Sequence, residues 1–172
     1  MTKPDPSLLR DIVPPKVLDA LRLSSDALTR SGVRHIVIGG LAVGANGYPR
    51  ATRDVDFLVG GEAFDRHPSG LVTLRAGVPF QVNGVAVDFL SPESGEEFLE
   101  EALAAPPGSI AEAPTLIYLK LKSPRAKDRA DIIELIKGGI DVDACRAYLK
   151  KHASDFIAMF EEHVSRAQAE QD

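Results

Sequence analysis

The sequence predicts an α+β fold in which a sheet is flanked by helices and followed by a C-terminal helical layer. Short β-branched segments occur in the first half of the chain, an Asn83-Gly84 pair is typical of a hairpin turn, and the residues beyond Pro114 have helical periodicity. A chain of 172 residues with 44% hydrophobic content suits one domain with its own core. We expect one compact unit, with a core over residues 1–110 that includes an N-terminal helix and a helical part over residues 111–172 packed on it.

The first predicted elements are a helix, a strand, a short helix and a second strand. Apolar residues three and four apart over 15–31 predict an amphipathic helix that stops at Ser31-Gly32. Residues 35–38 are apolar and largely β-branched, which predicts a buried strand running into Gly39-Gly40. We then expect a short helix ending near Gly47 and a strand over 54–59, where polar and apolar side chains alternate.

The next part of the chain predicts a loop over 62–70 and two weaker strands over 71–75 and 79–82. Asn83-Gly84 then favours a tight hairpin turn, because both positions tolerate positive φ, and it leads into a strand over 85–90.

Helices dominate the remainder. Residues 91–105 are expected to form a helix capped by Ser91 or Ser94 and ended by the Pro106-Pro107-Gly108 break. Four further helices are expected over residues 115–122, 127–137, 141–152 and 154–168.

Composition excludes several classes of site and location. The single cysteine, Cys145, excludes an internal disulfide, and it falls on an apolar helical stripe, which indicates packing. The four histidines are too scattered for a zinc site. No run approaches the roughly 20 apolar residues of a membrane helix, and the N-terminus lacks the pattern of a signal peptide, so we expect a cytoplasmic protein with no membrane partner.

The net charge of −5 argues against the coating of a polyanion, but it is compatible with a local basic groove. Basic residues do gather, at Arg50 and Arg53 and again over residues 120–129. Either group fits a solvated face or contact with phosphate.

Two carboxylates share one face of the strand predicted over residues 54–59. Alternate side chains of a strand point the same way, so Asp54 and Asp56 lie on one face with Cα atoms about 6 to 7 Å apart. Paired carboxylates without basic partners are costly in a sheet unless cations or solvent compensate them. The pair therefore indicates either a metal site or a solvated strand edge.

Asp88 favours the metal interpretation. It occupies the polar face of the strand over 85–90, between apolar positions. If the two strands are neighbours, three carboxylates converge and supply the hard oxygen ligands of Mg²⁺ or Mn²⁺. Two such ions about 3.5 to 4 Å apart serve in-line nucleotidyl displacement.

Gly39-Gly40 lies where a buried strand turns into a short helix, a place where the lack of side chains lets phosphate approach the backbone. No Gly-Lys-Ser/Thr follows, so this is not the phosphate loop of nucleoside triphosphatases. A lone Gly-Gly is also typical of a tight turn.

The segment VIGGLAVGANGYPRATRDVDFLV resembles the signature of the polymerase-beta-like nucleotidyltransferase superfamily, especially its small bacterial abortive-infection-type members. The shared features are Gly-Gly, a following Gly and the pattern Arg-x-Thr-x-Asp-x-Asp, here Gly39-Gly40, Gly47, Arg50, Thr52, Asp54 and Asp56. A second block, LIYLKLKSPRAKDRADIIELI, is similar to the Lys-Leu, Arg-x-Lys-Asp and Asp-Ile pattern of those proteins.

The resemblance implies a mixed sheet of the polymerase-beta-like kind and a role for each matching residue. It implies that Asp54 and Asp56 bind metal and that Asp88 is the third carboxylate, which binds metal or acts as a general base. It further implies a nucleotide-binding set in which Gly39 and Gly40 accommodate phosphates and Lys120 neutralises phosphate charge. Arg50 and Thr52 have the same strand parity as Asp54, so we expect them to contact the triphosphate or orient the motif if the extended conformation begins there.

Lys127, Asp128 and Asp131 in the second block have both a structural and a functional interpretation. We favour the structural one, in which Asp128 caps a helix and Lys127 pairs with Asp131 one turn later.

The function that the sequence favours is transfer of a nucleoside monophosphate from an NTP to a hydroxyl, with release of pyrophosphate. The acceptor class is open between a tRNA end, a protein side chain and a small molecule such as an aminoglycoside. The resemblance implies a toxin beside a separate antitoxin protein. The alternatives are a catalytically silent module that binds nucleotide or a partner, and a metal-dependent hydrolase, which the lack of a His-rich ligand pattern disfavours.

Overall fold

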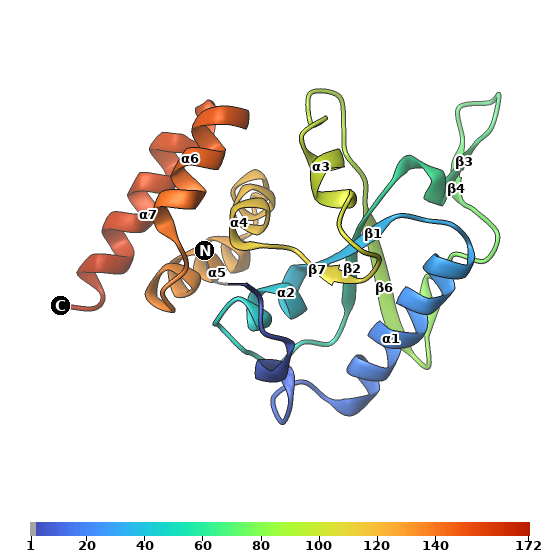
Figure 1. Ribbon diagram of the computed structural model, residues 1–172, viewed down its shortest axis with the longest axis horizontal. Coiled ribbons are helices and arrows are strands. Elements are labelled where there is room, and N and C mark those ends of the chain that lie inside the picture. The colour runs from blue at the N-terminus through green and yellow to red at the C-terminus, as the bar shows by residue number, and fades with distance from the viewer. Residues whose placement is uncertain (1–2) are drawn as a thin grey trace.

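The computed structural model describes residues 3–172 and has the expected α+β architecture, with a mixed sheet at its centre (Figure 1). The strand order in the sheet is β5 (Gln81–Val82), β6 (Val85–Leu90), β2 (Val55–Val59), β1 (His35–Ile38) and β7 (Ser109–Ile110). β2 runs parallel to β6, β1 runs parallel to β7, and the other two pairs are antiparallel. The predicted strands over 35–38 and 85–90 are confirmed, and the one over 54–59 is confirmed from Val55 onwards.

Alternation along the strands divides the core between the two faces of the sheet. Val55, Phe57 and Val59 of β2 are buried in a cluster that includes α1 (Pro15–Arg30). Leu58 points to the other face and joins a second cluster with α4 (Ala113–Lys122). Asp56 has the same parity as Leu58. The carboxylate therefore lies on the α4 side of the sheet.

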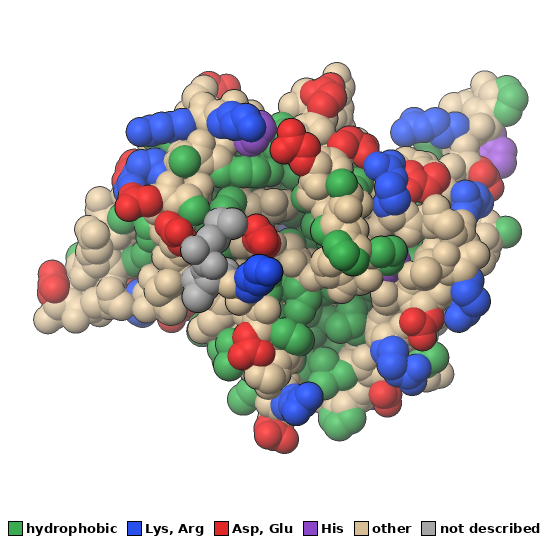
Figure 2. Space-filling view, in the orientation of Figure 1, with side chains coloured by type: hydrophobic (Ala, Val, Ile, Leu, Met, Phe, Trp, Pro, Cys, Tyr) green, Lys and Arg blue, Asp and Glu red, His purple; other side chains and the backbone are tan. Residues whose placement is uncertain are grey.

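Helix α2 (Gly39–Ala45) follows β1 without a loop and begins at the Gly-Gly pair itself. The chain before α1 forms the 3-10 helix η1 (Pro6–Leu9), which contacts α2. Figure 2 shows hydrophobic side chains gathered in the hollow between this N-terminal segment and α1.

The C-terminal helical layer consists of α4, α5 (Ala126–Lys137), α6 (Val142–His152), the 3-10 helix η3 (Ser154–Phe156) and α7 (Ile157–Ala169). Asp141 caps α6 by accepting a hydrogen bond from the backbone N–H of Ala144 at 2.9 Å. Cys145 is fully buried in the core, as its helical stripe predicts. Figure 1 shows that α6 and α7 lie outermost, with α4 and α5 nearer the sheet.

The helix expected over residues 91–105 is wrong in its length and its caps. Only α3 (Leu99–Leu103) forms, and no side chain caps it. Gly95 adopts φ of +87°, and buried Glu96 instead accepts hydrogen bonds from Tyr118 at 2.8 Å and Lys122 at 2.6 Å. These tertiary hydrogen bonds to α4 outweigh the local preference of the segment for a helix.

Two further differences involve short strands. The expected loop over 62–70 contains the 3-10 helix η2 (Gly61–Ala63) and β3 (Phe64–Arg66), which pairs with β4 (Val72–Leu74) as a separate small hairpin. Strand β7 was not expected at all. Within residues 3–172, none of the helices combines the length and the apolar character that crossing a membrane requires.

Candidate active site

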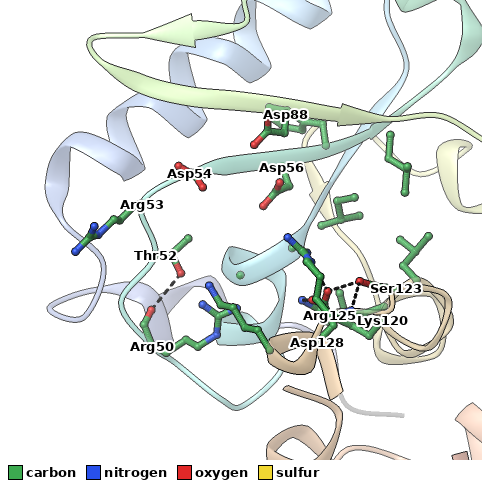
Figure 3. A pocket seen from close by; sticks show the side chains of 18 of the residues that line it. Arg50, Thr52, Arg53, Asp54, Asp56, Asp88, Lys120, Ser123, Arg125 and Asp128 are labelled. Atoms are coloured by element: carbon green, nitrogen blue, oxygen red, sulfur yellow. Dashed lines mark hydrogen bonds and ion pairs between the residues drawn. The ribbon is translucent and has the colours of Figure 1, made fainter. Parts of the chain in front are cut away.

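The two strands that carry carboxylates are neighbours, as the metal interpretation requires. β2 and β6 run in parallel register, and Asp56 stands directly opposite Asp88. Paired strands lie about 4.8 Å apart, so the two carboxylates start from adjacent positions on one face. Asp54 immediately precedes β2 and is exposed, as is Asp88. Figure 3 shows all three beside the same two strands.

Asp56 has a perturbed carboxyl group. Burial raises its pKa to about 6, and the charges of Asp88 and Asp54 add to this effect. The charges of Lys120 and Arg125 act in the opposite direction. Within residues 3–172, none of the recorded ion pairs involves Asp54, Asp56 or Asp88. The charge of Asp56 is therefore held beside two other carboxylates without a direct cationic partner, which costs free energy of folding.

We expect Asp56→Asn to stabilise the metal-free protein by about 1 to 2 kcal/mol at pH 7.5. The pKa of Asp56 is higher in the folded state than its ordinary value of 3.8. Stability linked to this group is therefore fully present below pH 4 and is lost as the pH rises through about 6. The free energy of urea unfolding in EDTA, at pH 7.5 and pH 4, checks this.

Asp65→Asn, on an exposed position of β3, is the matched control. At pH 7.5 the free energy of unfolding should rise in Asp56→Asn but not in Asp65→Asn. At pH 4 neither variant should differ from the wild type. Equal stabilities of the wild type and Asp56→Asn at both pH values would contradict the cost of burying the charge of Asp56 beside Asp88 and Asp54.

The Gly-Gly pair brings the start of α2 against the carboxylate. Gly39 has φ of +67°, and a Cβ atom added there would overlap Oδ2 of Asp56 and lie 2.8 Å from its Cβ. A Cβ atom at Gly40 would lie 2.9 Å from Oγ1 of Thr52 and 3.3 Å from Nη1 of Arg50. Both glycines are therefore needed for the close approach of backbone to these side chains.

Gly39→Ala is expected to destabilise the protein more than Gly32→Ala, by at least about 1 kcal/mol. The two glycines have nearly the same φ, +67° and +68°, so the backbone strain matches. Only at Gly39 does the new Cβ meet Asp56, while nothing lies within 4 Å at Gly32. Urea unfolding of both variants measures the difference, and equal losses would disprove the steric role of Asp56.

Arg50 and Thr52 line the same cleft, but not as a continuation of the strand. β2 begins only at Val55, so strand parity does not extend to these two residues. Oγ1 of buried Thr52 donates to the carbonyl of Arg50 at 3.2 Å. Arg50 donates from Nε and Nη2 to the two carboxylate oxygens of Asp131, at 3.0 and 2.9 Å. Arg50 is thus held bidentately by α5.

Lys120 belongs to the same buried network. Its Nζ donates to Oδ1 of Asp128 at 2.6 Å and to Oδ2 of Asp131 at 2.8 Å, and its side chain is only 7% exposed. Two carboxylates therefore compensate the charge of Lys120, the residue that the resemblance implies for neutralising phosphate charge.

Asp128 and Asp131 do have structural contacts, but with other residues than expected. Asp128 does not cap α5, whose first turn lacks a side-chain cap, because its carboxylate accepts from the side chains of Lys120, Ser123 and Arg125. Burial opposes ionisation, but these hydrogen bonds lower the pKa of Asp128 to about 2. Asp131 pairs with Arg50 and Lys120, and the expected pair with Lys127 does not form.

A cleft of about 590 Å³ brings all the sequence-predicted site residues together. Its lining includes Gly39, Gly40, Arg50, Thr52, Asp54, Asp56, Asp88 and Lys120. Ser123, Arg125 and Asp128 also line it and had no assigned site role, although the Arg-x-Lys-Asp block contains the last two. One wall thus carries carboxylates and the opposite wall carries basic side chains (Figure 3).

The cleft is not a preassembled metal cage. Among residues 3–172, no group of three or more His, Cys, Asp or Glu side chains meets the geometry of a metal site. The donor set nevertheless fits Mg²⁺, because this ion is commonly bound by one or two carboxylates together with substrate phosphates. Asp56 and Asp88, in register and without a cationic partner, supply such a pair.

Comparison of the sequence with protein-family models and with curated proteins finds no match. Among solved structures, the chain is similar to the crystal structure of an antigenic nucleotidyltransferase-like protein from Paracoccidioides brasiliensis. The similarity has a TM-score of 0.42 and 12% sequence identity, and it covers 87% of this chain and 94% of that chain.

Proposed function

We propose that the chain is a nucleotidyltransferase that moves a nucleoside monophosphate from an NTP to a hydroxyl acceptor. The observation that carries this proposal is the register of Asp56 and Asp88 on two parallel strands, facing a basic wall across one cleft. Carboxylates that hold a divalent ion, opposite cations that bind phosphate, are the arrangement that transfer from a triphosphate needs. The spacing of Gly39-Gly40, Arg50, Thr52, Asp54 and Asp56 supports the same reaction and a polymerase-beta-like sheet.

Asp56 and Asp88, with Asp54 beside them, would hold Mg²⁺. When bound, the ion neutralises phosphate charge and lowers the pKa of the attacking hydroxyl. Asp56 is fixed between β2 and the first residue of α2, so its carboxylate has little freedom to turn away. Gly39 and Gly40 line the same cleft, and we assign them to the phosphates of the NTP, next to the side chains of Asp56 and Thr52 that approach them.

The acceptor is proposed to approach from the β6 side. Ala86, Asp88 and Leu90 alternate along one face of β6 and are exposed, so nothing in residues 3–172 buries this strip. The acceptor oxygen attacks the α-phosphorus, its proton passes to Asp88, and the bond to the bridging oxygen of pyrophosphate breaks with its electron pair on the leaving group.

The test uses the wild-type protein, Mg²⁺ and a bacterial cell extract with each NTP labelled either at the α- or at the γ-phosphate. We expect α-label to become attached to an acceptor, with one pyrophosphate released for each transfer. Transfer of γ-label would indicate a kinase, and free monophosphate without labelled acceptor a hydrolase. Binding of NTP without either product would make the cleft a silent nucleotide-binding module, which contradicts the proposal.

The destination of the label also identifies the acceptor class. A tRNA end, a protein side chain and a small molecule separate by size and by nuclease or protease treatment. A toxin role beside an antitoxin belongs to the same proposal, and a purified partner that blocks label transfer would support it.

A further inference from the structure

Arg125 differs from Arg50 and Lys120, the other two cations of the ion network, because most of its side chain is exposed. It is the residue that precedes α5, and it comes after the short loop that follows α4. Its side chain is 72% exposed, whereas those of Arg50 and Lys120 are 16% and 7% exposed. Figure 3 shows Arg125 across the cleft from Asp56.

The charges of the network leave an excess on this arginine. Lys120 bridges the carboxylates of Asp128 and Asp131, and Arg50 pairs with Asp131 alone, so two cations meet two carboxylates in the buried part. Arg125 is a third cation on the same two carboxylates, through Asp128. The network therefore carries one net positive charge, and that charge is at its exposed end.

The hydrogen bonds of Arg125 also leave its outer nitrogens available. Nε donates to Oδ2 of Asp128 at 2.7 Å, and within residues 3–172 no recorded hydrogen bond uses Nη1 or Nη2. A guanidinium held at Nε has lost much of its rotational freedom before a ligand arrives. Its two Nη groups can then donate to phosphate oxygens in a bidentate manner.

We propose that Arg125, rather than Lys120, is the side chain that binds the triphosphate from the α5 side, and that Asp128 positions its guanidinium. The proposal rests on the proposed function, because it assigns the phosphate contact within that same cleft. Lys120 keeps a structural role, since its Nζ bridges Asp128 and Asp131 and is almost completely buried. The hydrogen bond to Asp128 raises the pKa of Arg125, and the charge of Asp56 across the cleft adds a smaller contribution.

The experiment measures binding of two probes by calorimetry, each with Mg²⁺: the four NTPs one at a time, and inorganic tripolyphosphate. Arg125→Ala should weaken both probes by about 10- to 100-fold, because it removes charge-assisted hydrogen bonds to phosphate. The affinity of Arg125→Lys for each probe should lie between those of the wild type and Arg125→Ala, because an ammonium keeps the charge but cannot bind Asp128 and phosphate in the same bidentate way. Unfolding of both variants should be close to wild type, since Asp128 keeps Lys120 and Ser123 as partners.

Arg129→Ala is the matched control, because Arg129 is an exposed arginine in the first turns of α5, four residues after Arg125, and does not line this cleft. Its affinity for both probes should equal that of the wild type. If wild-type protein binds the probes and Arg125→Ala binds tripolyphosphate equally well, the inference is wrong while the proposed function stands. If the wild type binds no NTP, the proposed function fails and the inference fails with it.

Discussion

Asp56→Asn is expected to lower nucleotidyl transfer at least about 1,000-fold without unfolding the protein. The amide has nearly the shape of the carboxylate, so the contact with Gly39 is kept. What is lost is the charge that faces Asp88 in register, and with it the affinity for a divalent ion at the triphosphate. The same substitution should raise stability in EDTA, so lost activity cannot be attributed to lost folding.

The measurement is the initial rate of α-label transfer to the acceptor at saturating NTP and Mg²⁺. Asp65→Asn again serves as the control, and its rate should equal that of the wild type. An Asp56→Asn protein that keeps more than a tenth of the wild-type rate would exclude Asp56 as a metal ligand.

Asp131→Asn is expected to have the largest effect on stability, a loss of about 3 to 5 kcal/mol. Asp131 is buried and accepts from Nε and Nη2 of Arg50 and from Nζ of Lys120. Without the charge of Asp131, Arg50 loses its ion pair and remains largely buried. Breaking a buried pair from one side leaves an uncompensated charge, which costs more than the pair itself contributes.

The free energy of urea unfolding checks this prediction. Glu134→Gln, on the same helix, removes the charge from a partly exposed pair with Lys137 and should change stability by less than about 1 kcal/mol. If the two variants lose the same stability, the network does not join α4 and α5 to the loop before β2 as described.

The carboxylate pair could be predicted because it depends on local periodicity. In strands 85–90 and 54–59 the polar positions alternate with apolar ones, so their faces follow from the sequence. That the strands are neighbours was a condition of the prediction, and the register of Asp56 with Asp88 fulfils it. Gly39 and Gly40 were identified in the same way, from their place at the end of a buried strand.

The ion network could not be predicted, because its partners are chosen by tertiary packing. Asp131 and Arg50 are 81 residues apart, and Asp131 and Lys120 are 11 apart. Local spacing suggested Lys127 as the partner of Asp131, one helical turn away, but Lys127 is exposed while Asp131 faces the core. Burial of the carboxylate decides the choice, since a buried charge needs a close partner.

The short elements were missed for a related reason. β7 has two residues and is defined by its pairing with β1, so no periodicity marks it. The segment before α3 carries the helical pattern, but Glu96 is drawn to Lys122 and Tyr118 of α4, and the helix starts later.

The most direct test of the central claim, that Asp56 and Asp88 together hold a divalent ion against a triphosphate, is calorimetric titration of NTP with Mg²⁺ and with EDTA. The wild type should bind at least about ten times more tightly with Mg²⁺. Asp56→Asn and Asp88→Asn should each bind NTP equally in Mg²⁺ and in EDTA while remaining folded. Equal affinity of the wild type in Mg²⁺ and EDTA, or an increase in affinity with Mg²⁺ in Asp88→Asn as large as that of the wild type, would contradict the claim.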